Sequence, residues 1–123
     1  MKKLLIASCM ALALPTAAFA DVAAELTVAD QHAGFAAKAT TIDMVHMHLH
    51  HVLNCLVGPS GPGFDAAPGN PCAKAGNGAI ADGGDKAKLQ PVVDDVNAGL
   101  AATDVATAQG DAQKAAAAIE AAK

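Results

Sequence analysis

The segment 44–51, MVHMHLHH, contains four histidines and two methionines, and Cys55 follows it. Imidazole nitrogens and thioether sulfurs are ligands for transition metals. Residues three or four positions apart on a helix share one face, so histidines at these spacings can reach the same ion. The pattern therefore predicts a metal site, with His46 and His50 as its main pair. The candidate ligands are His46, His50, His32, His48, His51, Met44 and Met47.

Copper fits this mixture of ligands best. Imidazole suits Cu(II), Zn(II) and Ni(II), whereas the thioethers of Met44 and Met47 would also accept Cu(I). Zinc and nickel are the alternative metals. An imidazole must be neutral to bind an ion, so affinity is expected to fall below the reference histidine pKa of about 6.5.

Two readings without such an ion stay open. A b-type haem held by His and Met inside a helical bundle ranks below the metals, and a cofactor-free structural or interaction bundle is the third alternative. Covalent c-type haem is excluded because the sequence contains no C-x-x-C-H.

The histidine-rich segment is predicted to lie on a helix over residues 41–57, which begins near Thr40 and ends at Gly58-Pro59. At about 100° per residue, one narrow stripe of this helix is apolar and should face the core. The histidines then form two ladders, one on each side of this stripe. The stripe consists of Ile42, Val45, Leu49, Val52 and Leu56.

Three more helices are expected: 28–39 with Thr27 as its cap, one with Pro91 in its first turn that ends near Ala108, and one from Gly110-Asp111 to the C-terminus. The predicted fold class is all-α, a small up-down bundle of four helices, or of three if the first two are continuous. A hairpin turn near Thr40 would bring His32 opposite His46 or His50, as a third imidazole.

Residues 58–85 are rich in glycine and proline and cannot form a regular helix or a central strand. Cys55 and Cys72 are predicted to form a disulfide that pins this long loop to the helix before it. A thiolate metal ligand or a redox pair is the functional alternative. Asp85 is expected to cap the helix that follows.

Residues 1–20 have the pattern of a secretory signal peptide, with Lys2 and Lys3, an apolar run and a small-x-small end at Ala18-Phe19-Ala20. A lipoprotein reading at Cys9 is the alternative. The expected organisation is a signal peptide over 1–20 and a helical metal-binding domain over 21–123, with the loop at 58–85. The apolar run is too short for a membrane anchor, so a periplasmic or secreted protein is predicted.

Removal of Lys2 and Lys3 would leave 6 of the 8 basic residues against 12 acidic ones, a formal net charge of −6. This charge argues against nucleic acid and anionic membranes as partners. Metal ions are the expected partners, and self-association into a homo-oligomer is left open. No enzyme is predicted, because Ser60 is the only serine after residue 20 and no catalytic motif accompanies it.

The segments AGFAAKATTIDMVHMHLHH and AGLAATDVATAQGDAQKAAAAIEAA, behind a signal peptide, resemble the small periplasmic His-rich metal-binding proteins that form four-helix bundles. That resemblance implies binding of copper and other divalent metals, and a role in buffering or scavenging. The two expected C-terminal helices contain no histidine, so the resemblance extends only to five candidate ligands: His32, His46, His48, His50 and His51.

Overall fold

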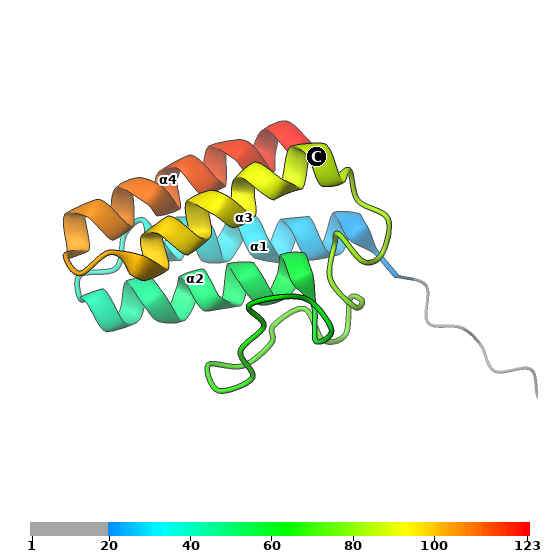
Figure 1. Cartoon of the computed structure of the whole chain (residues 1–123), viewed down its shortest axis with the longest axis horizontal. Helices are drawn as coiled ribbons and strands as arrows, with labels where there is room; N and C mark the ends of the chain where they lie inside the picture. The colour runs from blue at the N-terminus through cyan, green and yellow to red at the C-terminus, as the bar shows by residue number, and fades with distance from the viewer. Residues whose placement is uncertain (1–19) are drawn as a thin grey trace, which may run out of the picture.

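The computed structural model describes residues 20–123, which form four helices and no strand. Helices α1 and α2 form one hairpin, α3 and α4 form a second, and both hairpins turn at the same end of the molecule (Figure 1). The all-helical class, the four helices and the turn between the first two are therefore confirmed. The predicted signal peptide, except Ala20, lies outside the described residues. The helices are α1 (Val22–Ala36), α2 (Ile42–Val57), α3 (Lys86–Ala101) and α4 (Val105–Ala122).

Each helix begins at a side chain that accepts a hydrogen bond from the backbone of its first turn. Asp21, Thr41, Asp85 and Asp104 are these N-caps. Such a cap satisfies donors that have no partner within the helix, and its loss costs about 1 kcal/mol. The expected role of Asp85 is confirmed, and the start of α2 differs from the prediction only in using Thr41 in place of Thr40.

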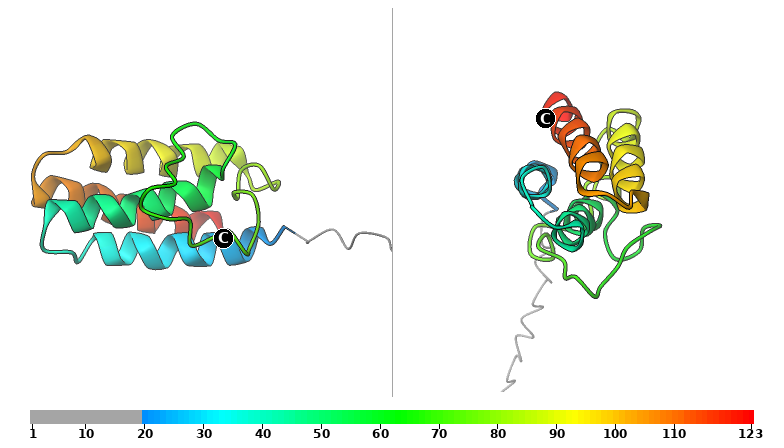
Figure 2. Two further views of the ribbon diagram at one scale, coloured as in Figure 1. Left: turned by 90° about the horizontal axis from the view of Figure 1, so that it is seen from below. Right: turned by 90° about the vertical axis from the view of Figure 1, so that its left-hand side faces the viewer.

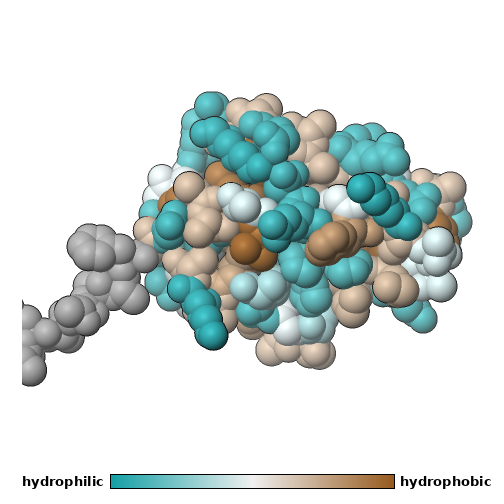
Figure 3. Space-filling model, turned by 180° about the vertical axis from the view of Figure 1, so that it is seen from behind, coloured by the Kyte–Doolittle hydropathy of each residue, from teal (hydrophilic) through white to brown (hydrophobic). Residues whose placement is uncertain are grey.

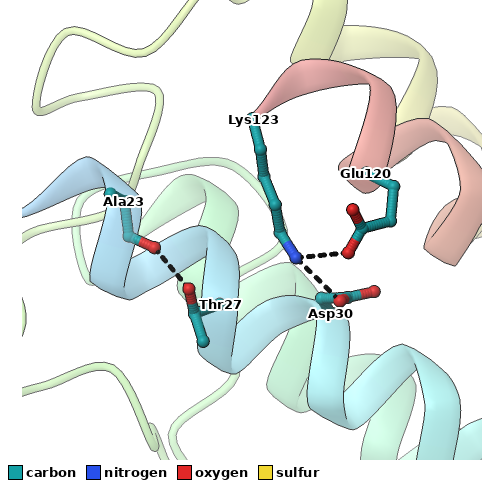
Figure 4. Close-up of polar contacts among 5 residues, drawn as sticks. All are labelled: Ala23, Thr27, Asp30, Glu120 and Lys123. Atoms are coloured by element: carbon teal, nitrogen blue, oxygen red, sulfur yellow. Dashed lines mark hydrogen bonds and ion pairs between the residues drawn. The ribbon is translucent and has the colours of Figure 1, made fainter.

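For three of the helices, predicted boundaries are wrong. The Thr27 hydroxyl donates to the carbonyl of Ala23 inside α1, so it caps nothing, and the helix starts five residues before it (Figure 4). Helix α3 already includes Pro91 in its second turn and ends at Ala101. Helix α4 runs through Gly110, because the chain turns earlier, at Asp104. Pro91 has no N–H to donate to the carbonyl of Ala87 one turn earlier, so α3 lacks one helical hydrogen bond there.

The core lies between the four helices, which surround it when the molecule is seen end on (Figure 2). The predicted stripe of α2 faces it: Val45, Leu49, Val52 and Leu56 are fully buried, and Ile42 is partly buried. Helices α1 and α4 contribute mainly alanines, which bury little area each but allow close approach.

The loop between α2 and α3 packs against the end of α2 (Figure 2). The predicted disulfide is present, joining Cys55 to Cys72 with 5.2 Å between their Cα atoms. The backbone N–H groups of Ala79 and Ile80 donate to the carbonyls of Cys55 and Leu56, at 2.9 and 3.0 Å. Gly58 is needed here, since it has a φ of 67° and a Cβ would meet the carbonyl of residue 77 at 1.5 Å. The loop therefore completes the C-terminal end of α2.

The two hairpins are also joined by an ion pair. The Lys123 ammonium, directly after α4, lies 2.8 Å from Asp30 on α1 and also contacts Glu120 on α4 (Figure 4). The face seen in Figure 3 is largely hydrophilic, with apolar residues scattered among polar ones. Within residues 20–123, the helices fall short of the length and apolarity required to span a bilayer.

Candidate metal centre

Three histidines from two helices meet on the surface of the α1–α2 hairpin. His32 lies on α1, and His48 and His51 lie on α2. The Nδ1 atom of His32 is 3.1 Å from Nδ1 of His48 and 3.2 Å from Nδ1 of His51. One ligand atom from each residue lies within 4.8 Å of the others, so the cluster could hold one metal ion. All three side chains are partly buried.

The turn between the helices explains this meeting. Helix α1 ends at Ala36 and α2 starts at Ile42, so the two helices run back along each other. His32 is thereby level with the middle of α2, as the hairpin prediction required. His48 and His51 are three residues apart and therefore project from the same face of α2.

The contacts among the rings are poorly explained by hydrogen bonds alone. A neutral imidazole nitrogen carries either one proton or one lone pair. Nδ1 of His32 has two nitrogen neighbours at hydrogen-bond distance, so at most one of these contacts can be a good hydrogen bond. A tetrahedral ion with metal–nitrogen bonds of about 2.0–2.1 Å holds its nitrogens about 3.3 Å apart. The two distances from Nδ1 of His32 are therefore close to the nitrogen–nitrogen spacing around a bound ion.

The loop fixes the protonation of one ring. Nε2 of His51 lies 2.7 Å from the backbone carbonyl of Pro68. A carbonyl oxygen only accepts, so Nε2 must carry the proton and Nδ1 is left with a lone pair. In metal sites, a hydrogen bond of this kind orients the ligand ring and selects its tautomer. His51 thus already presents a ligand atom toward His32.

Burial favours the neutral form of two imidazoles in the cluster, those of His32 and His48. Loss of solvent, followed by the nearby charges that His51 and His48 would carry, lowers the pKa of His32 to about 4. Burial, with His51 as a second cause, also lowers the pKa of His48. Protons therefore compete with a metal at these two residues at a lower pH than the reference value of 6.5 suggested. Both imidazoles are available as ligands at neutral pH.

An aromatic ring contacts two of the imidazoles, and two methionines lie near them in the sequence of α2. The Phe35 ring lies 5.6 Å from that of His32 and 5.4 Å from that of His48, measured between centroids. Met44 and Met47 lie one turn before His48 and His51 on α2. Among the described residues, these three are the large hydrophobic side chains that are exposed, by 53%, 46% and 37% for Phe35, Met44 and Met47. The cluster is therefore open to solvent beside two thioethers.

The predicted main pair lies elsewhere. Nε2 of His46 is 3.0 Å from the carbonyl of Ala102, so this ring donates to the end of α3. His50 has a buried Nδ1 without a hydrogen-bond partner. The expectation that His32 would face His46 or His50 is wrong: the structure brings His32 to His48 and His51, on the other side of the core stripe. The two ladders of histidines on α2 were predicted correctly, but the side on which α1 crosses α2 decides which ladder His32 meets.

Sequence reasoning missed the contact of His51 with Pro68 and the buried amide of Asn54, which donates to the loop carbonyls of Asp65 and Gly69. The sequence did contain a signal for Asn54, because its amide lies within the apolar run that ends α2. A polar group at such a buried position needs hydrogen-bond partners. Nothing in the sequence indicated which loop carbonyl would meet His51.

The chain matches no protein-family model, no curated protein and no solved structure.

Proposed function

We propose that this protein is an exported transition-metal binding protein that buffers or scavenges copper in the periplasm. His32, His48 and His51 bind one ion through their Nδ1 atoms. The two contacts that Nδ1 of His32 makes, at 3.1 Å with Nδ1 of His48 and at 3.2 Å with Nδ1 of His51, carry the proposal. The disulfide supports an oxidising compartment, and the resemblance to periplasmic His-rich proteins supports the same role.

Copper is favoured over other metals by the ligands at hand. Three neutral imidazoles suit Cu(II), Zn(II) and Ni(II), and Cu(II) is generally bound most tightly among these ions. Met44 and Met47 stand beside the cluster and add soft sulfur ligands that zinc and nickel do not need. The same site can therefore serve both oxidation states of copper, with zinc and nickel as the alternative occupants.

Binding is favoured over catalysis by the composition of the cluster. The group that could hold an ion consists of three imidazoles alone, without a carboxylate to serve as a general base. A b-type haem would need room between the helices, where fully buried side chains such as Leu49 and Val96 are packed. We therefore infer a storage or buffering role for one ion per chain.

A set of competition titrations tests this proposal. Metal-free protein is titrated with Cu(II), Zn(II) and Ni(II) in air, and with Cu(I) under anaerobic conditions. One equivalent should bind, and His32→Ala, His48→Ala and His51→Ala should each weaken it by more than about tenfold. His46→Ala and His50→Ala are the matched controls, since they remove the same ring from the same helix outside the cluster.

The controls should leave the affinity within about threefold of wild type. The proposal fails if no metal binds, or if the two control variants weaken binding more than the three cluster variants do. A Soret band in protein from haem-replete cells would instead support the haem alternative.

A further inference from the structure

Asn54 is a fully buried amide whose hydrogen bonds all go to the loop. Its Nδ2 donates to the carbonyls of Asp65 and Gly69, both at 2.7 Å. Its Oδ1 accepts from the N–H of Asp65 at 3.1 Å. Both donor hydrogens and one acceptor position are thus used, which is a nearly complete set for this side chain. Asn54 therefore holds the loop by hydrogen bonds at two residues, Asp65 and Gly69, which are four positions apart.

The loop segment that Asn54 holds, residues 65–69, contains the carbonyl that orients His51. Pro68 lies between Asp65 and Gly69, and its carbonyl accepts a hydrogen bond from His51 Nε2. Asn54 and His51 are three residues apart on α2, so the amide and the imidazole project from neighbouring turns of the same helix. One helix therefore supplies both the ligand and the side chain that fixes the ligand's hydrogen-bond partner.

The disulfide does not perform this task by itself. Cys72 is anchored to α2 four residues after Pro68, and Asp65 precedes Pro68 by three. Without Asn54, the partly buried carbonyls of Asp65 and Gly69 would lose their side-chain donor, and carbonyls shielded from water without partners are disfavoured. The segment 65–69 would then rearrange toward water while the disulfide stayed closed.

We propose that Asn54 is a positioning residue of the metal centre: it holds the loop so that the Pro68 carbonyl keeps His51 in the tautomer whose Nδ1 faces His32 and His48. The consequence for metal affinity rests on the proposed function. The consequence for the tautomer of His51 does not, because it concerns the metal-free protein.

The experiment is a long-range 1H–15N NMR spectrum of the metal-free protein at pH 7.5, followed by titration with zinc chloride. In wild type, His51 should be protonated at Nε2 and unprotonated at Nδ1. In Asn54→Ala, His51 should change to a mixture of tautomers, and zinc affinity should fall about 10- to 100-fold. Asn70→Ala is the matched control, since Asn70 Oδ1 accepts the N–H of Cys72 within the same loop but holds neither Asp65 nor Gly69.

The control should retain both the tautomer and the affinity. The proposal is overturned if Asn54→Ala keeps the wild-type tautomer of His51 while its helices remain folded. If Asn54→Ala loses its helical circular dichroism, the measurement is made on Asn54→Asp. A carboxylate at this position still accepts from the N–H of Asp65 but cannot donate. Unfolding of both variants would also overturn the proposal. Failure of wild type to bind zinc or any of the other ions titrated above would refute the proposed function and leave the tautomer result standing.

Discussion

The lowered pKa of His32 makes the stability of the metal-free protein depend on pH in a defined direction. The folded-state pKa is about 4, below the value of 6.5 for an unperturbed histidine. The unfolded chain therefore binds more protons than the folded one as the pH falls through 6.5. The contribution of His32 to the free energy of unfolding should be fully present above pH 6.5. It should decrease as the pH falls from there to about 4, and should level off below.

The size of this effect follows from the shift. A displacement of about 2.5 pKa units corresponds to about 3.4 kcal/mol at 1.36 kcal/mol per unit. His32 is only partly buried, so screening by solvent reduces the expected contribution to about 1–2 kcal/mol. Glu25 acts in the opposite direction, since burial raises the pKa of its carboxyl and its contribution to stability is lost as the pH rises.

Comparison with a non-titrating variant isolates His32. Urea unfolding of wild type and of His32→Gln, followed by circular dichroism with a chelator present, gives the free energy of unfolding at pH 7.5 and at pH 4. Wild type should lose about 1–2 kcal/mol more than His32→Gln between these values, while Glu25 contributes equally to both proteins and cancels. Equal losses in the two proteins would refute the inference that His32 is held neutral in the fold.

Three further outcomes test the packing. Cys55 and Cys72 should yield no free thiol in denatured, unreduced protein, and replacing both with serine should lower the free energy of unfolding by about 3 kcal/mol, since the crosslink spans 17 residues; two free thiols would contradict this. Gly110→Ala should raise the free energy of unfolding by about 0.5–1 kcal/mol, because a Cβ there meets nothing within 4 Å on α4. Gly99→Ala should lower the free energy of unfolding by about 1–3 kcal/mol, because its Cβ would lie 2.7 Å from the buried Leu49 side chain. Thermal melts in which the two glycine variants shift in the same direction would show that the helix contacts are misplaced.

The apolar stripe of α2 could be predicted from sequence because its period is that of a helix, and so could the disulfide, because only two cysteines follow residue 20. The caps were harder to predict. Thr27 and Asp111 each resemble a helix start, but the helices extend past them, since packing in the core outweighs a local preference.

The choice between the two histidine ladders could not be made from sequence. Both ladders have the spacing of a ligand pair, and the choice depends on which side of α2 helix α1 crosses. That crossing is set by packing of the whole bundle, including the alanines Ala29 and Ala33 of α1, which are fully buried. The role of the loop was equally hidden, because the carbonyl of Pro68 belongs to the backbone and leaves no mark in the residue pattern.

We propose that three Nδ1 atoms from α1 and α2 bind one ion. Long-range 1H–15N NMR of the protein with one equivalent of zinc reads each imidazole nitrogen separately. We expect Nδ1 of His32, His48 and His51 to shift to metal-bound values together and their Nε2 atoms to stay protonated, with His46 and His50 unchanged. Metal-bound shifts at His46 or His50, or at the Nε2 atoms of the cluster, would contradict it.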